Sequence, residues 1–87
     1  MRTFGTPFNP ATAIAYTVGQ ESLVEIGVFD ICGRRVATLF HGSRQAGQYR
    51  TIWDGKDDTG QAVPAGVYFC HLAIGSFSSI KKMLLVK

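Results

Sequence analysis

The sequence predicts an all-β domain, either a sandwich or a barrel, and three observations support this. Apolar and polar residues alternate over several short runs, as they do in half-buried strands. Clusters of Gly, Pro, Asp and Asn separate these runs and are typical of turns. No segment shows the apolar period of a helix. Short strands joined by turns in this way are typical of sandwiches and barrels.

In the first half of the chain, alternation predicts strands at residues 13–18, 23–31 and 35–40. The second strand should turn one face to the core, because its other face carries Glu25. The apolar faces expected to be buried are formed by Ile14, Tyr16 and Val18, then Val24, Ile26 and Val28, then Val36 and Leu39.

In the second half, strands are predicted at residues 48–53, 67–74 and 77–86, with one short additional strand at 60–63. The last two long strands are expected to pair as a terminal hairpin. The final strand should lie at or near an edge, where lysines oppose pairing with other chains. These lysines are Lys81, Lys82 and Lys87.

Several residues of these later strands are expected in the core. Tyr49, Thr51 and Trp53 share one face of their strand, whereas Ile52 lies on the other. Trp53 should be largely buried, so that truncating it would cost about 3–5 kcal/mol. In the next strand the residues expected to be buried are Val67 and Phe69.

Eight residues are expected to shape the turns. Gly accepts a positive φ, and Asp can hydrogen-bond back to its own turn. In the tight turn at residues 30–33, an Asp should cap the turn and a Gly should take the left-handed position. The predicted turn residues are Asp30, Gly33, Asp54, Gly55, Asp57, Asp58, Gly60 and Gly66.

Size and charge narrow the function classes. A chain of 87 residues forms one small domain with little room for a deep active-site pocket. The net charge of +3 is mild and the basic residues form only isolated pairs, which argues against nucleic-acid binding. No apolar run approaches the roughly 20 residues that span a bilayer. If the domain is exported, its signal is expected upstream in a longer precursor, or is the domain itself.

The sequence indicates no catalytic residues, cofactor site or metal site. Counted from Asp54, an EF-hand calcium loop would need oxygen ligands where Lys56 and Ala65 stand, so the aspartates are expected to cap turns. Cys32 and Cys70 do not have the spacing of a zinc site, and whether they are free or bonded stays open. His41 and His71 give no sign of a catalytic pairing with these cysteines.

Four segments, in this order along the chain, together resemble one family. They are P-F-N-P-A-T-A-I-A-Y at residues 7–16, D-I-C-G-R-R-V at 30–36, W-D-G-K-D-D-T-G at 53–60 followed by G-V-Y-F at 66–69, and K-K-M-L-L-V-K at 81–87. The family is that of the C-terminal sorting domains of type IX secretion cargo. These are akin to the immunoglobulin-like domain of flagellar hook-capping proteins.

The resemblance implies a fold, a location and partners. The fold would be an immunoglobulin-like β-sandwich of about seven antiparallel strands at residues 11–87, after an extended lead-in at 1–10. The domain would direct a larger protein through the periplasm to the cell surface or medium, without catalysis. Its partners would be an outer-membrane translocon, a sortase-like protease and an upstream cargo domain. The recognition residues would be Lys81, Lys82, Met83, Leu84, Leu85, Val86 and Lys87.

Two other functions remain open at this stage. The domain could be a structural or assembly module of the hook-cap type, or one that self-associates through an edge strand. It could instead be an accessory carbohydrate-binding domain of an extracellular enzyme. In that case exposed aromatic rings would form a platform, for which the candidates are Tyr16, Tyr49 and Tyr68.

Overall fold

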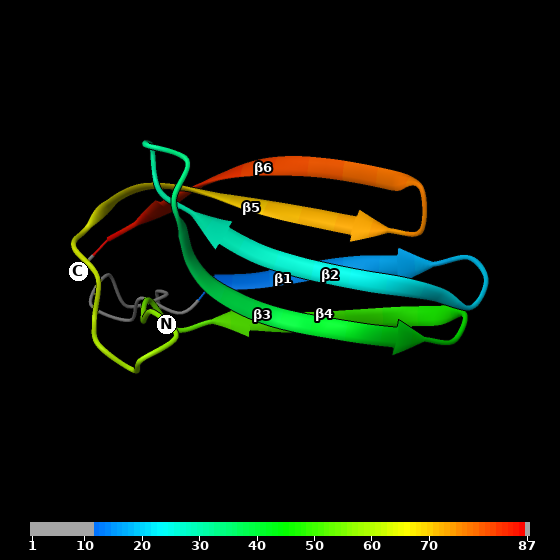
Figure 1. Ribbon diagram of the computed structural model, residues 1–87. Coiled ribbons are helices and arrows are strands. Elements are labelled where there is room, and N and C mark those ends of the chain that lie inside the picture. Colours follow the sequence, from blue (N-terminus) through cyan, green and yellow to red (C-terminus); the bar gives the residue numbers. More distant parts are fainter. Residues whose placement is uncertain (1–11, 87) are drawn as a thin grey trace.

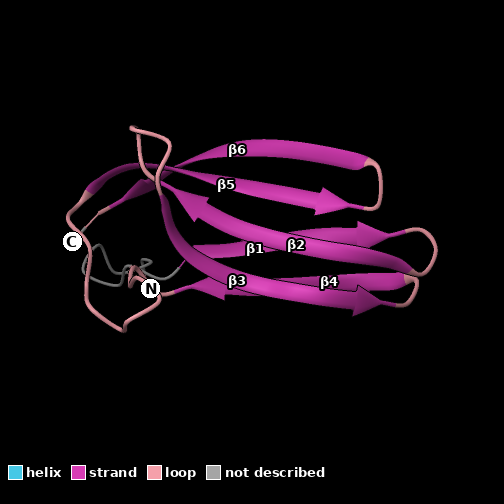
Figure 2. Cartoon of the chain, in the orientation of Figure 1, coloured by secondary structure: helices cyan, strands magenta, loops and turns pink. Residues whose placement is uncertain are grey.

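The computed structural model describes residues 12–86, and within these residues all regular structure is β (Figures 1 and 2). Six strands follow one another along the chain, and every strand pair is antiparallel. They are β1 (Thr12–Val18), β2 (Ser22–Phe29), β3 (Arg35–Arg44), β4 (Gly47–Trp53), β5 (Gly66–Ile74) and β6 (Phe77–Leu85).

The strands form two sheets of unequal width. β1 and β4 make a two-stranded sheet, in which Thr12 pairs with Trp53 and Val18 with Gly47. The other sheet has four strands in the order β3-β2-β5-β6. The two sheets lie as layers one behind the other, and the chain passes from one to the other after β1, after β3 and after β4 (Figure 1). The wider sheet therefore has strands that no strand of the narrower sheet faces.

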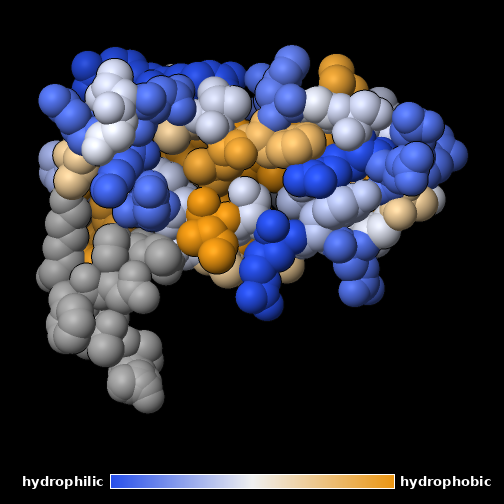
Figure 3. Space-filling view, turned by 90° about the horizontal axis from the view of Figure 1, so that it is seen from below, coloured by the Kyte–Doolittle hydropathy of each residue, from blue (hydrophilic) through white to orange (hydrophobic). Residues whose placement is uncertain are grey.

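One apolar core lies between the two layers, because buried side chains from both sheets belong to a single cluster. Its centre is Trp53, whose ring packs edge-on against the ring of Tyr68 at 5.1 Å between centroids. Both polar atoms of this pair are satisfied by backbone carbonyls: Trp53 Nε1 donates to Lys56 O, and Tyr68 OH donates to Pro64 O. Seen from below, hydrophobic surface lies in the middle of the molecule, interrupted by hydrophilic side chains (Figure 3).

Most expected faces are confirmed. All the residues expected inward in β1 and β2 are buried, and in β4 Trp53 is buried while Ile52 is exposed. The terminal hairpin of β5 and β6 also forms as expected. In β3 the buried residue is Ala37, while Val36 and Leu39 pack partly against the core.

The expected face of β5 was wrong. Tyr68 and Cys70 are buried, whereas Val67 and Phe69 are only half-buried on the opposite face. The physical reason is that β5 carries large apolar residues on both faces. The pairing with β2 determines which face of β5 is buried, because buried Val28 lies directly opposite Cys70.

The strand count also differs from the expected number of about seven. Within residues 12–86, the short strand expected at residues 60–63 is replaced by a single bridge between Lys56 and Ala62. The loop folds on itself there, since Val63 N donates to Gly55 O and Asp57 N donates to Gln61 O. The expected lead-in at residues 1–10 lies outside the described residues.

Candidate interaction surface

The four-stranded sheet has two outer strands, β3 and β6, whose free edges differ in how far other parts of the chain cover them. The edge of β3 is covered at its start by Asp58, which lies in the loop between β4 and β5. The backbone N–H of Asp58 donates to Val36 O at 3.3 Å, and its carboxylate Oδ1 accepts from Thr38 N at 2.9 Å. One residue thus satisfies a carbonyl and an amide that an added strand would otherwise pair with.

The edge of β6 has no such cover among the described residues, because β6 pairs only with β5. Its inner positions include Met83 and Leu85, which are 7% and 2% exposed and belong to the core. Its outer positions include Ile80 and Leu84, which are 67% and 65% exposed. The strand is therefore anchored by one face and open along its edge and its other face.

The residues expected to form a recognition element do not act as one group. Met83 and Leu85 are core residues that no partner can contact without unfolding the strand. Leu84 and Val86 are exposed large apolar residues. Lys87 lies outside the described residues.

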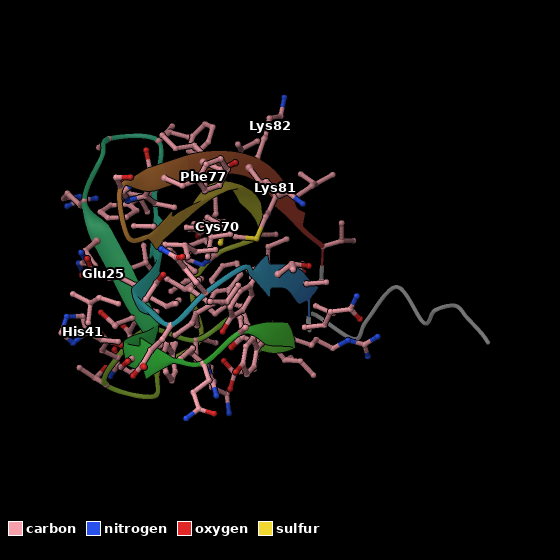
Figure 4. All side chains as sticks on the ribbon, turned by 90° about the vertical axis from the view of Figure 1, so that its right-hand side faces the viewer. Glu25, His41, Cys70, Phe77, Lys81 and Lys82 are labelled. Carbon is pink, nitrogen blue, oxygen red and sulfur yellow. The ribbon has the colours of Figure 1, made fainter. Side chains whose placement is uncertain are left out.

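Lys81 and Lys82 are both exposed, and they leave β6 in different directions (Figure 4). Lys82 stands on the outer face opposite Phe69, whereas Lys81 stands opposite buried Cys70 on the inner face. Lys81 remains exposed there because the two-stranded sheet is too narrow to cover the whole inner face of four strands. A partner lying along β6 would meet a positive charge on each face.

A shallow apolar depression lies beside this edge on the outer face of the four-stranded sheet. It measures about 480 Å³ and lies mostly against apolar side chains. Phe29, Phe69 and His71 form its floor from β2 and β5, and Ile80 forms its wall on β6. Ile31, which is 75% exposed, contributes from the turn after β2.

The other half of the same outer face is polar. Arg35 lies over Gly27 so closely that a Cβ at Gly27 would come within 2.7 Å of its Nη1. The guanidinium also stacks over the Phe29 ring, lies 3.5 Å from the Glu25 carboxylate and donates to Thr38 Oγ1. Glu25 and His41 are register partners on this half, well away from the β6 lysines (Figure 4). Apart from Leu23, which is 60% exposed on β2, the large apolar side chains exposed on this outer face lie toward β6.

The turn between β2 and β3 is built by Asp30 and Gly33. Asp30 Oδ1 accepts from Cys32 N and Arg34 N, and Asp30 O accepts from Gly33 N. Gly33 has a φ of 82°, which L side chains adopt only with strain. The hydrogen bond from the Arg34 amide is the main cause that lowers the pKa of the Asp30 carboxyl. This carboxylate is therefore occupied within its own turn.

The aspartates of the loop between β4 and β5 have separate roles. Asp54 accepts from Lys56 N, and Asp57 Oδ1 accepts from Thr59 N, Thr59 Oγ1 and Gln61 N. The Thr59 hydroxyl is the main cause that lowers the pKa of Asp57. The expectation that Asp58 caps its own loop was wrong, since its carboxylate bonds to β3 instead. The glycines with positive φ here are Gly55 at 77° and Gly60 at 88° in the loop, and Gly66 at 150° at the start of β5.

The cysteines and histidines do not come together. Cys32 is exposed in its turn and Cys70 is buried in β5, and both thiols are free. Burial raises the pKa of the Cys70 thiol, against a smaller lowering by the charge of Lys81. Within residues 12–86, no three His, Cys, Asp or Glu side chains gather in a way that could hold a metal ion.

The three tyrosines do not form an exposed aromatic platform, so they do not support the carbohydrate-binding alternative. Tyr16 and Tyr68 are each 6% exposed, and Tyr16 stacks on Tyr49 inside the molecule. Tyr49 OH donates to Gln45 O, just as Tyr68 OH donates to a carbonyl four residues before it. These rings hold the core and the strand ends. Alternation along β1 was the sequence signal that already placed Tyr16 inward.

In the part of the chain that the structure describes, no helix is long and apolar enough to cross a membrane. The four-stranded sheet thus has one edge covered at its start, one open edge with two lysines, and an apolar depression beside the open edge.

Comparisons with known proteins agree with this architecture. The family model of the FlgD Ig-like domain matches residues 9–73, which include β1 to β4 and nearly all of β5. Among solved structures, the crystal structure of FLGD from P. aeruginosa is similar, with a TM-score of 0.60 and 25% sequence identity. The match covers 86% of this chain and 59% of that one, so the chain spans only part of that protein's length. The comparison with curated protein sequences gave no match.

Proposed function

Because the chain belongs to the FlgD Ig-like domain family, we propose that it is a structural assembly module of the hook-cap type. The observation that carries this proposal is the family match across residues 9–73, together with the structural likeness to FLGD from P. aeruginosa. The module would act by contact with other protein subunits rather than by catalysis. The sequence left this assembly function open as an alternative to the type IX sorting function.

The arrangement of the ionisable groups supports binding rather than chemistry. The carboxylates of Asp30 and Asp57 accept hydrogen bonds within their own turns. The Cys70 thiol is buried and its raised pKa keeps it protonated, which is opposite to the activation that a nucleophilic thiol needs. The shifted groups thus serve the fold.

A hook-cap relationship also supports an extracellular location, since assembly of such a structure takes place outside the cell. The module would meet its neighbouring subunits there, after export as part of a larger protein. The open edge of β6 is the surface best suited to that contact, because backbone groups along an edge can pair with an added strand.

A chimera tests this function. The region of FLGD from P. aeruginosa that aligns with this chain would be replaced by the chain, and hook formation and swimming would be scored in a strain that lacks its own copy. We expect partial or full rescue. The control chimera carries Trp53→Ala, which removes the centre of the core and should abolish rescue. If the intact chimera is exported and folded but never supports assembly, the proposal is wrong.

A second function, type IX sorting, rests on the sequence resemblance of the last strand, which the family match does not reach. The family match ends at residue 73 and leaves out β6, which is the segment where the sorting resemblance adds K-K-M-L-L-V-K. Under this alternative, the translocon would recognise the exposed side chains of β6 on the folded domain.

Export of a reporter separates the two functions. The chain would be fused behind a signal peptide and a reporter in a bacterium with type IX secretion. Deleting residues 81–87 is a poor variant, because it removes the core residues Met83 and Leu85. Surface changes such as Leu84→Ser with Lys82→Ser keep the core and should trap the reporter in the periplasm if sorting is correct. Export equal to that of the unchanged fusion would reject this function.

A further inference from the structure

We infer that the open edge of β6 binds an extended segment of another protein that carries two adjacent acidic residues flanked by apolar ones. This inference rests on the proposed function, because it names the surface and the partner chemistry by which the module would assemble. It follows from three features of the described residues: which edge is free, which charges line it, and which apolar surface continues it.

The first feature is that, among the described residues, the β6 edge of the four-stranded sheet has no cover, whereas the β3 edge is covered at its start. Asp58 occupies Val36 O and Thr38 N on β3, so a strand added there would have to displace the chain's own loop. β6 has a partner on one side only and offers a run of nine residues. Such a run supplies an unpaired row of backbone donors and acceptors to an added strand.

The second feature is the charge on that edge. Lys81 is the middle residue of β6 and Lys82 follows it on the opposite face. If two copies of β6 paired antiparallel over their full length, each Lys81 would face the same residue of the other copy. Like charges directly opposite destabilise a strand pair, and opposite charges stabilise it. The edge therefore disfavours a second copy of this chain and favours an acidic strand.

The third feature is apolar surface on the outer face beside the lysines. Ile80 and Leu84 flank Lys82 on this face, since they lie two residues before and after it. Ile80 also walls the depression over Phe29 and Phe69. A partner strand would thus present apolar, acidic and apolar side chains at alternate positions on its outer face, with a second acidic residue opposite Lys81.

This pattern defines a probe peptide. Running antiparallel to β6, the sequence T-I-T-E-E-V-T-T places Ile opposite Leu84, the two Glu opposite Lys82 and Lys81, and Val opposite Ile80. The matched control T-I-T-K-K-V-T-T has the same shape and strand propensity with reversed charge. Both would be titrated into the isotope-labelled chain while backbone amide shifts and affinity are measured.

We expect the Glu peptide to shift amides of β6 and of the depression, and to bind at least about tenfold more tightly than the Lys peptide, because two cross-strand charge pairs change sign. The double variant Lys81→Glu/Lys82→Glu should reverse this preference. A control variant, Lys56→Glu, changes an exposed lysine in the loop and should leave the preference as it is. Thermal unfolding of each variant checks that the fold is retained.

Three outcomes would overturn the inference: no binding of the Glu peptide, shifts that map to β3 or the loops, or an affinity ratio that the double variant does not change. The chimera experiment is independent of these. Rescue without peptide binding at β6 removes the edge inference and keeps the assembly function. Peptide binding without rescue keeps the edge and its partner chemistry and removes the hook-cap function.

Discussion

The edges of β3 and β6 belong to the same sheet, yet the chain itself covers the start of the β3 edge and leaves the β6 edge open, with two lysines at its centre. Asp58 uses one backbone amide and one carboxylate to cover the start of the β3 edge. β6 instead carries Lys81 and Lys82 at its centre. A covalently attached cover protects against every partner, whereas lysines protect only against partners that are not acidic. Two edges of one small sheet can thus differ in the kind of partner strand that they would admit.

The largest expected effect is the difference in stability loss between substitutions on the buried face of β6 and on its exposed face. Met83→Ala should lower the free energy of unfolding by about 2–5 kcal/mol, because it opens a cavity in the core. Leu84→Ala, one residue further along, should change it by less than about 0.5 kcal/mol. Urea denaturation measures both. Similar losses for the two variants would mean that β6 is not anchored by one face.

A smaller effect is expected at the turn that sets β3 beside β2. Gly33→Ala places a Cβ on a residue with a φ of 82° and should cost about 1–2 kcal/mol. The matched control is Gly19→Ala, where a Cβ would have no atom within 4 Å, and which should be neutral or slightly stabilising. Urea denaturation of both variants, compared by their unfolding midpoints when the denaturant slopes are equal, would measure this difference in stability. Equal midpoints for the two variants would contradict the strain at Gly33.

Removing the cover of β3 tests the comparison most directly. Asp58→Ala should lose about 1 kcal/mol, since one exposed hydrogen bond to Thr38 N disappears. It should also make the protein self-associate at high concentration, because Thr38 N on the β3 edge becomes free to pair with another strand. Sedimentation velocity would detect this. Asp54→Ala is the control, because Asp54 bonds only within its own turn. A monomeric Asp58 variant would show that Asp58 is not the barrier.

The smallest effect is the response to acid. Hydrogen bonds lower the pKa of Asp30 and Asp57 below their ordinary value near 3.8. A carboxyl with a lowered folded pKa stabilises the fold above its unfolded pKa, and this contribution is lost as pH falls through the folded value. The urea midpoint should therefore fall between neutral pH and pH values below about 3.8. Asp30→Asn and Asp57→Asn together should flatten that fall, and an unchanged slope would refute the assignment.

Strict alternation made part of the fold predictable from the sequence. In β1 the residues between Ile14, Tyr16 and Val18 are small or polar, so only one face can be buried, and the structure agrees. In β2 the single charge of Glu25 identifies the outer face. The terminal hairpin could be predicted because two apolar runs are separated by only a short turn around Gly75.

The remaining features depend on contacts between distant residues. β5 is apolar on both faces, so its sequence does not say that Tyr68 and not Phe69 faces the core. In β6, likewise, the sequence does not indicate that Met83 is buried and Leu84 exposed, because both residues are apolar. Asp58 looks like its neighbours Asp54 and Asp57, and only the packing of its loop against β3 gives it a different role. Of the residues predicted for recognition on β6, Leu84 is exposed whereas Met83 and Leu85 are buried in the core.

The pairing of β1 with β4 has a consequence for the order of folding. β5 and β6 are joined by a short turn, so their contacts close a small loop and can form early. Thr12 instead pairs with Trp53, with all of β2 and β3 in between, and this long-range contact costs more chain entropy. The hairpin that bears the open edge should therefore be structured before the core is sealed by the two-stranded sheet. Substitutions in β1 should then mainly speed unfolding, while substitutions in the β5–β6 turn should slow folding, as stopped-flow kinetics would reveal.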